Sequence, residues 1–220
     1  MFKKILSFFV PVNLVRRDSH ISQKLEVTLN NGKLVLDSKN TNYSYGSLQR
    51  ILRKGLHYIG FDRIRKFEHV LVLGVAGGSV IKTLSDDIKY KGKITGVEID
   101  PKVIELANTY FGLAEVRNCT IVIEDAFEFV LKAKEKYDLI IIDIFKDAEM
   151  PGFLFEEFWI NSINALLNVN GFILFNTMTL NKDHKDRNLA YKAAFNSDYS
   201  VRMYPKVEDH NELFTIKKLR

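Results

Sequence analysis

Two features of the sequence, a glycine-rich segment and an acidic residue further along the chain, have a spacing suited to holding a nucleotide. The first is Gly74-Val-Ala-Gly-Gly-Ser79, whose small residues would let the backbone approach a ligand while the following helix offers its N-terminal amides. The second is Glu98, twenty residues beyond Gly78, where a carboxylate can accept hydrogen bonds from both ribose hydroxyls. Glycines also serve tight turns and a strand-end glutamate can face water, but the pairing favours nucleotide binding.

Two further acids follow apolar runs of the sequence. In Glu124-Asp125-Ala126, the Asp125 carboxylate could accept the adenine amino group while the Ala126 amide donates to a ring nitrogen. The alternative is that Asp125 caps the next helix, and the two roles can coexist. Asp143 stands directly behind three isoleucines, where a carboxylate costs desolvation unless something pairs with it. Residues in active sites are often of this type, so Asp143 is a candidate site residue.

The glycine pattern indicates which nucleotide is expected. Dinucleotide folds usually carry G-x-G-x-x-G, whereas this chain has Gly74-x-Ala76-x-x-Ser79. Asp125 and Asp143, the acids that follow two of the apolar runs, fit an adenosyl sulfonium ligand better than a dinucleotide. The predicted co-substrate is therefore S-adenosylmethionine or its decarboxylated form, with no metal. Its predicted contacts are Gly74, Ala76, Gly77, Gly78, Glu98, Ile99, Asp125 and Ala126.

These residues meet in space only if they follow neighbouring parallel strands, because ligands of open α/β sheets bind beyond the carboxyl ends of the strands. Short apolar runs predict strands that helices cover on both faces. They lie at 70–73, 94–99, 120–123, 139–142 and 171–175, with two more at 200–204 and 213–217. Asp100-Pro101 and Asp125 are N-cap signals for intervening helices. The predicted fold is α/β, a doubly wound, mostly parallel seven-stranded Rossmann-like sheet over residues 69–220.

Residues 1–68 are predicted to form a small N-terminal β-hairpin region and a leading helix. The alternation Leu25-x-Val27-x-Leu29 resumes after Asn30-Asn31-Gly32, which indicates a β-hairpin with a tight turn. A helical apolar pattern then runs from Leu48 to Leu56. The first ten residues have a basic start and a short apolar stretch like a weak signal peptide, but no cleavage pattern follows. A packed N-terminal segment is the expectation.

Composition narrows the classes of partner. The formal net charge is +5, with basic clusters at Arg50/Arg53/Lys54, Arg63/Arg65/Lys66 and Lys217/Lys218/Arg220. Solvated faces explain such clusters better than nucleic acid does, since no aromatic-studded basic stretch accompanies them. No apolar run is long enough to span a bilayer, and no membrane partner is expected. Cys119 is the single cysteine, which excludes intramolecular disulfides and thiolate clusters and makes a reducing cytoplasm the expected compartment.

From about Leu25 to Thr177 the sequence resembles the spermidine-synthase (polyamine aminopropyltransferase) family, which has the fold of class I S-adenosylmethionine-dependent methyltransferases. The resemblance lies in the segments already described, in Tyr137-Asp-Leu-Ile-Ile-Ile-Asp143 and in Leu154-Phe-Glu-Glu-Phe-Trp159. It implies that Asp143 is the catalytic aspartate and that Tyr45 is an active-site tyrosine. It also implies a small-molecule acceptor and suggests a homodimer through the hairpin edge.

The sequence departs from that family at the acceptor side. The family follows its catalytic aspartate with Ser-Ser-Asp-Pro, whose second aspartate holds the cationic amine, whereas this chain reads Asp143-Ile-Phe-Lys-Asp147. Lys146 therefore occupies the position of an acid and would repel a polyamine, at a cost of roughly 1–4 kcal/mol for like charges about 4 Å apart. Asp147 could replace the acid by a one-residue shift. Lys146 and Asp147 are the predicted substrate-binding residues.

Three functions follow from these features. The favoured one is a transferase of this family that acts on an acceptor other than the usual diamine, with Asp143 and Tyr45 taking up or holding the amine proton. A true polyamine aminopropyltransferase is the second. A methyltransferase on a small molecule, protein or RNA is the third, and a non-catalytic nucleotide-binding module is the remaining alternative.

Overall fold

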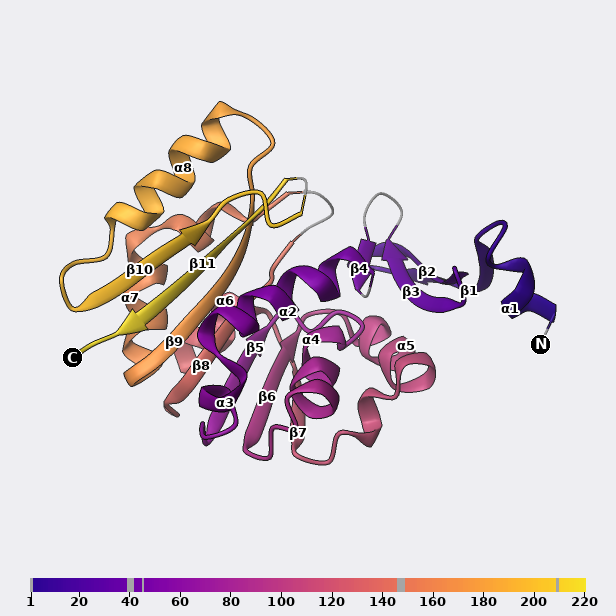
Figure 1. Ribbon diagram of the computed structural model, residues 1–220, viewed down its shortest axis with the longest axis horizontal. Coiled ribbons are helices and arrows are strands. Elements are labelled where there is room, and N and C mark those ends of the chain that lie inside the picture. The colour runs from indigo at the N-terminus through magenta and orange to yellow at the C-terminus, as the bar shows by residue number, and fades with distance from the viewer. Residues whose placement is uncertain (1, 39–41, 45, 146–148, 209) are drawn as a thin grey trace.

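Among the residues that the structure describes, the chain forms two β-sheets with helices around the larger one (Figure 1). The computed structural model describes residues 2–38, 42–44, 46–145, 149–208 and 210–220. Tyr45, Lys146 and Asp147, all predicted to serve the acceptor, lie outside these ranges.

The larger sheet has seven strands in the order β10-β11-β9-β8-β5-β6-β7. The pairs from β9 to β7 are parallel, and β11 and β10 are antiparallel to their neighbours. The order reverses between β5 and β8, which creates the crevice where ligands bind in such sheets. The predicted doubly wound, mostly parallel sheet is confirmed. Its strands are β5 (His69–Leu73), β6 (Lys93–Glu98), β7 (Cys119–Ile123), β8 (Tyr137–Ile142), β9 (Leu167–Met178), β10 (Tyr199–Tyr204) and β11 (Asn211–Lys218).

Helices cover both faces of this sheet, which explains why its central strands are apolar throughout. Val70 and Val72 face one core cluster, whereas Leu71 and Leu73 face the other. The first cluster contains side chains from α2 (Ser47–Ile59), α4 (Ser79–Lys82) and α5 (Pro101–Phe111). The second contains side chains from α6 (Ala126–Lys132), α7 (Glu157–Leu166) and α8 (Lys182–Ala193). Shorter helical segments are α3 (Phe61–Ile64), η1 (Thr83–Asp87), η2 (Leu113–Glu115) and η3 (Gly152–Phe155).

The predicted helix caps are confirmed. The Asp100 carboxylate accepts a hydrogen bond from the Lys102 amide at 2.9 Å, with Pro101 in the first helical turn. The Asp125 carboxylate accepts a bond from the Phe127 amide at 2.8 Å. Both caps satisfy backbone donors that a helix cannot satisfy itself, and both follow strands of the parallel sheet.

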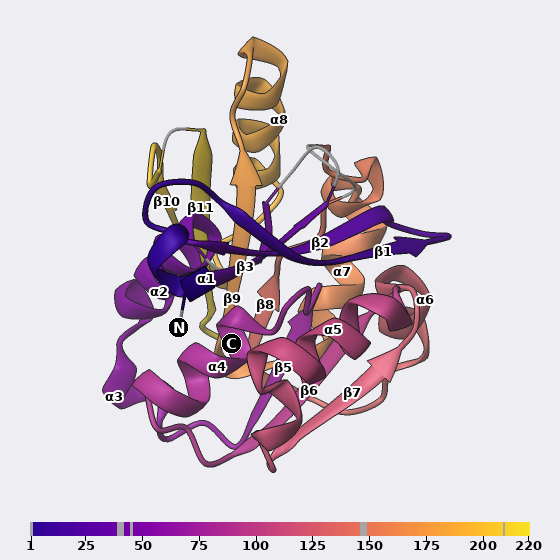
Figure 2. The same ribbon diagram turned by 90° about the vertical axis from the view of Figure 1, so that its right-hand side faces the viewer.

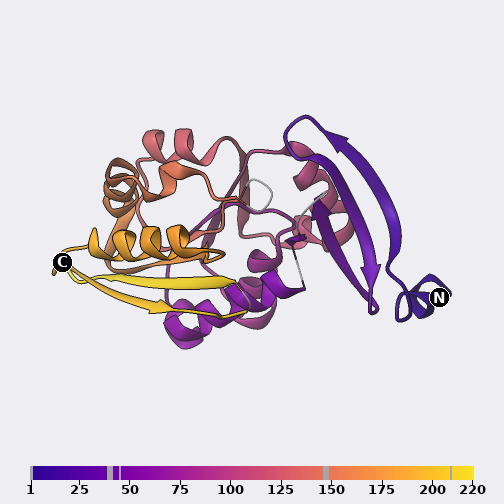
Figure 3. The ribbon, with the colours of Figure 1, turned by 90° about the horizontal axis from the view of Figure 1, so that it is seen from above.

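The smaller sheet consists of four antiparallel strands in sequence order (Figures 1 and 3): β1 (Val12–Ser19), β2 (Gln23–Asn30), β3 (Lys33–Ser38) and β4 (Asn42–Ser44). The predicted hairpin is its centre, and Asn31 and Gly32 have the positive φ angles of a tight turn. Its inner face packs on α5 through Leu25, Val27 and Leu36. Figure 2 shows β1 and β2 running across the larger sheet.

The first residues differ from the expectation. They form a short helix, α1 (Phe2–Leu6), none of whose residues is buried, so the prediction of a packed segment is wrong for residues 2–6. The apolar residues there have too few neighbours to cover them, because α1 lies beyond the end of the four-stranded sheet (Figure 1).

The basic cluster of α2 is neutralised within the chain. Arg50 binds both carboxylate oxygens of Glu208 at 2.8 and 2.9 Å, and Arg53 binds Asp87 at 2.7 Å. These two arginines are paired with carboxylates of the loop before β11 and of η1. Because their charges are already neutralised, this helix is a poor surface for binding nucleic-acid phosphates.

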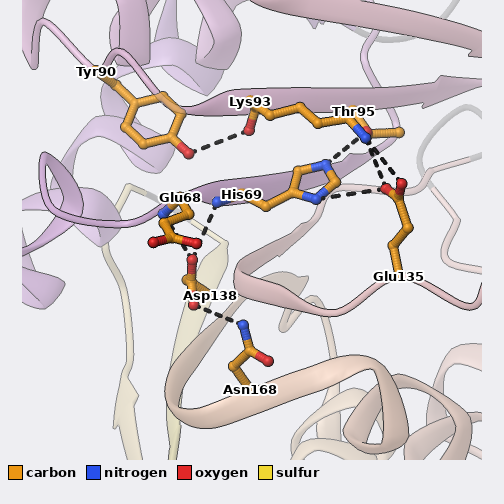
Figure 4. A network of polar contacts seen from close by, with 8 residues as sticks. All are labelled: Glu68, His69, Tyr90, Lys93, Thr95, Glu135, Asp138 and Asn168. Carbon is orange, nitrogen blue, oxygen red and sulfur yellow. Dashed lines mark hydrogen bonds and ion pairs between the residues drawn. The ribbon is translucent and has the colours of Figure 1, made fainter.

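At the amino ends of the strands, a polar network joins β5, β6, β8 and β9 (Figure 4). Asp138 accepts hydrogen bonds from the backbone amides of Glu68 and His69 and from the Asn168 side chain. The His69 ring contacts the Thr95 hydroxyl at 2.9 Å. Burial lowers the pKa of His69, and the positive charge of Lys93 acts in the same direction. This edge of the sheet is thus held by polar contacts and lies opposite the carboxyl ends of the strands.

We predict that His69 lowers the free energy of unfolding as the pH drops through about 6.5, the ordinary pKa of histidine, whereas the raised pKa of Asp143 acts in the opposite direction. The unfolded chain takes up a proton there that the His69 ring resists in the folded state, so acid favours unfolding. Urea unfolding at a series of pH values measures this slope. Relative to the unchanged protein, a His69→Gln variant should gain stability as the pH falls over this range, and an identical pH dependence of the two proteins would contradict the assignment.

Candidate active site

A cavity of about 610 Å³ lies at the carboxyl ends of the parallel strands. Of the predicted contacts, its wall includes Gly74, Ala76, Glu98, Ile99, Asp125 and Ala126, together with the predicted catalytic Asp143. Gly77 and Gly78 are not part of the wall. Gly78 has a φ of 81° and begins α4, so its role in the structure is the turn into that helix.

Gly74 sets the distance between β5 and β8. Its φ of 87° is rarely adopted by residues with a side chain, and a Cβ there would collide with the backbone carbonyl of Asp143. The Asp143 amide donates to the Leu73 carbonyl at 2.9 Å, and the Gly74 amide donates to the Val97 carbonyl at 3.0 Å. The two strand ends are therefore in backbone contact, which places Asp143 beside the glycine loop.

Glu98 ends β6 and is buried. Its carboxylate accepts hydrogen bonds from the amides of Ala76 at 2.9 Å and Asp100 at 3.1 Å. Desolvation raises the pKa of Glu98, while these backbone donors oppose the shift. Ala76 has a positive φ of 49°, so its hydrogen bond to the Glu98 carboxylate holds the loop in a conformation that alanine rarely adopts.

A neutral side chain supports the Asp143 carboxylate. The Asn176 side chain, at the end of β9, donates to its carboxylate at 2.9 Å and accepts from the Asn211 side chain at 3.0 Å. Desolvation raises the pKa of Asp143 to about 6, the Asn176 hydrogen bond opposes the rise, and the Glu98 charge adds to it. A carboxyl group with this pKa is suited to exchange a proton near neutral pH.

The turn between β1 and β2 closes one side of the cavity with residues 20–23. It is fixed by Asp100, whose buried carboxylate accepts the hydroxyls of Ser19 at 2.5 Å and Ser22 at 2.6 Å. Since the same carboxylate caps α5, the smaller sheet is tied directly to the strand end that carries Glu98.

Several wall residues were missed by the sequence analysis. Asn176 directly follows the predicted strand 171–175, so the rule that selected Asp143 would also have found it. The turn at 20–23 gave no signal because the strand before it was not predicted. Five further wall residues are apolar, namely Ile144, Phe145, Pro151, Phe153 and Met178.

Within the described ranges, no group of three or more histidine, cysteine, aspartate or glutamate side chains is arranged to hold a metal ion. Nor is any helix in those ranges long and apolar enough to cross a membrane.

Solved structures with the same fold define the class of protein. A probable spermidine synthase from Corynebacterium glutamicum aligns with a TM-score of 0.73 and 15% identity, covering 94% of this chain and 79% of that one. Human methyltransferase-like protein 13, solved with S-adenosylhomocysteine (SAH), aligns with a TM-score of 0.66 and 20% identity, covering 80% and 83%. At these identities the likeness shows the fold alone, which is that of the spermidine synthases and methyltransferases.

Sequence comparison identifies the family. The family model for the spermine/spermidine synthase domain matches residues 53–217, and the chain belongs to this family. The polyamine aminopropyltransferase of Vibrio vulnificus is 28% identical over 141 residues, which are 63% of this chain and 47% of that protein. The chain thus spans about half the length of this curated relative.

The contact at Gly74 leads to a prediction. Gly74→Ala should destabilise the protein by about 2–5 kcal/mol and abolish nucleotide binding, because it forces a positive φ on alanine and pushes β5 from β8. Gly152→Ala is the matched control, since a Cβ at Gly152 meets no atom within 4 Å. Thermal unfolding and calorimetry with S-adenosylmethionine and its decarboxylated form measure both effects. Equal behaviour of the two variants would contradict the role of Gly74.

Proposed function

We propose that this protein transfers an aminopropyl group from decarboxylated S-adenosylmethionine to an amine other than the usual diamine. The observation that carries the proposal is the charge of the cavity. Four carboxylates belong to its described wall, and none of the described wall residues is lysine or arginine. A donor that has lost its own carboxylate and keeps a sulfonium and an ammonium group suits such a wall.

The nucleotide side of the cavity would hold the donor. Glu98 would accept the ribose hydroxyls, while Asp125 and Ala126 would meet the adenine edge and Ile99 its face. Asp125 caps α6 and still lines the cavity, so capping and adenine binding are compatible. Gly74 and Ala76 would let the backbone approach the sulfonium end of the ligand.

Asp143 would act on the acceptor. An amine attacks the carbon next to sulfur only after losing a proton, and the Asp143 carboxylate would take up this proton or hold the neutral amine. As the new carbon–nitrogen bond forms, the carbon–sulfur bond breaks and the electron pair leaves on a neutral thioether. Tyr45 is proposed to assist, and Lys146 and Asp147 to border the acceptor.

The acceptor is proposed to carry one amine on a largely apolar body. Around Asp143 the described wall offers the amides of Asn176 and Asn211 and apolar side chains, and in those ranges this side has no second acid. A diamine would leave its second ammonium group without a carboxylate, which costs binding energy.

Methyl transfer from intact S-adenosylmethionine is the second candidate. It is favoured by the fold shared with human methyltransferase-like protein 13, which was solved with SAH. The same cavity and Asp143 would serve this reaction.

Calorimetric titration with the two donors tests the function. We expect tighter binding of decarboxylated S-adenosylmethionine, and faster transfer to n-butylamine than to putrescine. Preference for intact S-adenosylmethionine would establish the methyltransferase instead. Preference for putrescine would contradict the proposed acceptor, and failure to bind either donor would contradict the proposed function as a whole.

The pKa of Asp143 gives a second test. Transfer should decline as the pH falls through about 6, because protonated Asp143 cannot take up the amine proton. Asn176→Ala should move this limb to higher pH, since it removes the hydrogen bond that favours the carboxylate. Asp143→Asn should lower kcat about 10²–10⁴-fold.

Carboxyl-carbon nuclear magnetic resonance titration follows the same pKa without any acceptor, with Asp143→Asn assigning the signal. Asn168→Ala is the matched control, because Asn168 makes the same kind of bond to Asp138 at the opposite edge of the sheet. If Asn176→Ala does not raise the pKa of Asp143, the hydrogen bond from Asn176 does not stabilise the Asp143 carboxylate, and the role proposed for Asn176 is contradicted.

A further inference from the structure

The N-terminal tip, residues 2–10, exposes more apolar surface than any role in the fold explains. Phe2 is 79% exposed and Phe9 is 81% exposed. Other apolar side chains of the tip are exposed as well, namely Ile5, Leu6, Phe8 and Val10. Contiguous apolar surface of this kind marks a site of interaction with a partner or a membrane.

The tip is held in a defined place rather than left to fray. Ser7 is buried, and its carbonyl accepts the Asn31 amide at 2.9 Å while its hydroxyl accepts the Gly32 amide at 3.0 Å. The Phe8 ring lies over Gly32, where a Cβ would displace it. The turn between β2 and β3 therefore presents the tip as a fixed projection at the end of the smaller sheet (Figures 1 and 3).

The charge of this region has one sign. Lys3 and Lys4 are exposed beside the apolar side chains, Lys33 is exposed in the adjoining turn, and the first acid of the chain is Asp18. Apolar side chains that insert at the headgroup level, combined with basic residues, are the two signals that hold a protein on an anionic bilayer. If two copies of the chain paired through their tips instead, these lysines of one copy would lie close to the same lysines of the other, and like charges would repel.

We propose that the N-terminal tip docks this protein on an anionic lipid surface, with its apolar side chains inserted and Lys3, Lys4 and Lys33 against the headgroups. Such docking requires no spanning helix. The tip is separate from the cavity, because none of residues 2–10 belongs to the cavity wall.

Co-sedimentation of the full chain with vesicles tests the proposal. We expect binding to vesicles of phosphatidylcholine and phosphatidylserine in equal parts, and much weaker binding to phosphatidylcholine alone. Phe9→Asp should abolish binding. Lys3→Gln combined with Lys4→Gln should weaken it about 25-fold, at about fivefold for each lysine.

Matched controls separate the tip from general surface effects. Leu189→Asp adds the same charge at an exposed apolar position of α8, and Lys91→Gln with Lys134→Gln removes two exposed lysines elsewhere. These controls should bind vesicles like the unchanged protein, and circular dichroism should show every variant folded.

Three results would overturn the proposal: no vesicle binding, equal binding to both vesicle types, or equal losses in the tip and control variants. Light scattering is measured in parallel. A dimer that Phe9→Asp dissociates, without vesicle binding, would assign the tip to self-association instead.

Discussion

The backbone contact between the ends of β5 and β8 is the constraint on which the site depends. At Gly74 the two strand ends approach so closely that no side chain fits against the Asp143 carbonyl. This contact lies where the strand order reverses. The chain after β5 therefore continues to β6 on one side of the crevice, whereas the chain after β8 continues to β9 on the other side. The glycine loop and Glu98 fall on one side of it, while Asn176 and Asn211 fall on the other.

The electrostatics of the site follow from this geometry. Glu98 and Asp143 are brought near each other in a poorly hydrated place, where desolvation raises the pKa of both and the charge of Glu98 adds to the rise at Asp143. Glu98 is supported by backbone amides, whereas Asp143 has the weaker support of a neutral side chain. The two acids therefore differ in their support: backbone amides hold the Glu98 carboxylate, whereas Asp143, with a pKa raised to about 6, lies close to its protonation equilibrium near neutral pH.

Much of this arrangement was predictable because it depends on local pattern. The apolar runs, the caps at Asp100 and Asp125 and the Asn31-Gly32 turn each report a short-range preference, and all were found. Strand β1 was not, because its residues are half-exposed and lack a regular alternation. The partners of Asp143 depend on strand order and on contacts between segments more than 30 residues apart, which local pattern does not encode. The exposed N-terminal tip is a similar case, since an apolar sequence does not reveal whether anything covers it.

The double use of Asp100 has a consequence for how this protein can change over generations. Its carboxylate belongs at once to the α5 cap and to the turn of the smaller sheet. A recombination event that exchanged the N-terminal sheet for another would leave that buried anion short of two donors unless the newcomer also brought hydroxyls to the same points. The two sheets therefore depend on each other. The substitutions that the turn of the smaller sheet can accept are limited by Asp100, which lies beside the larger sheet.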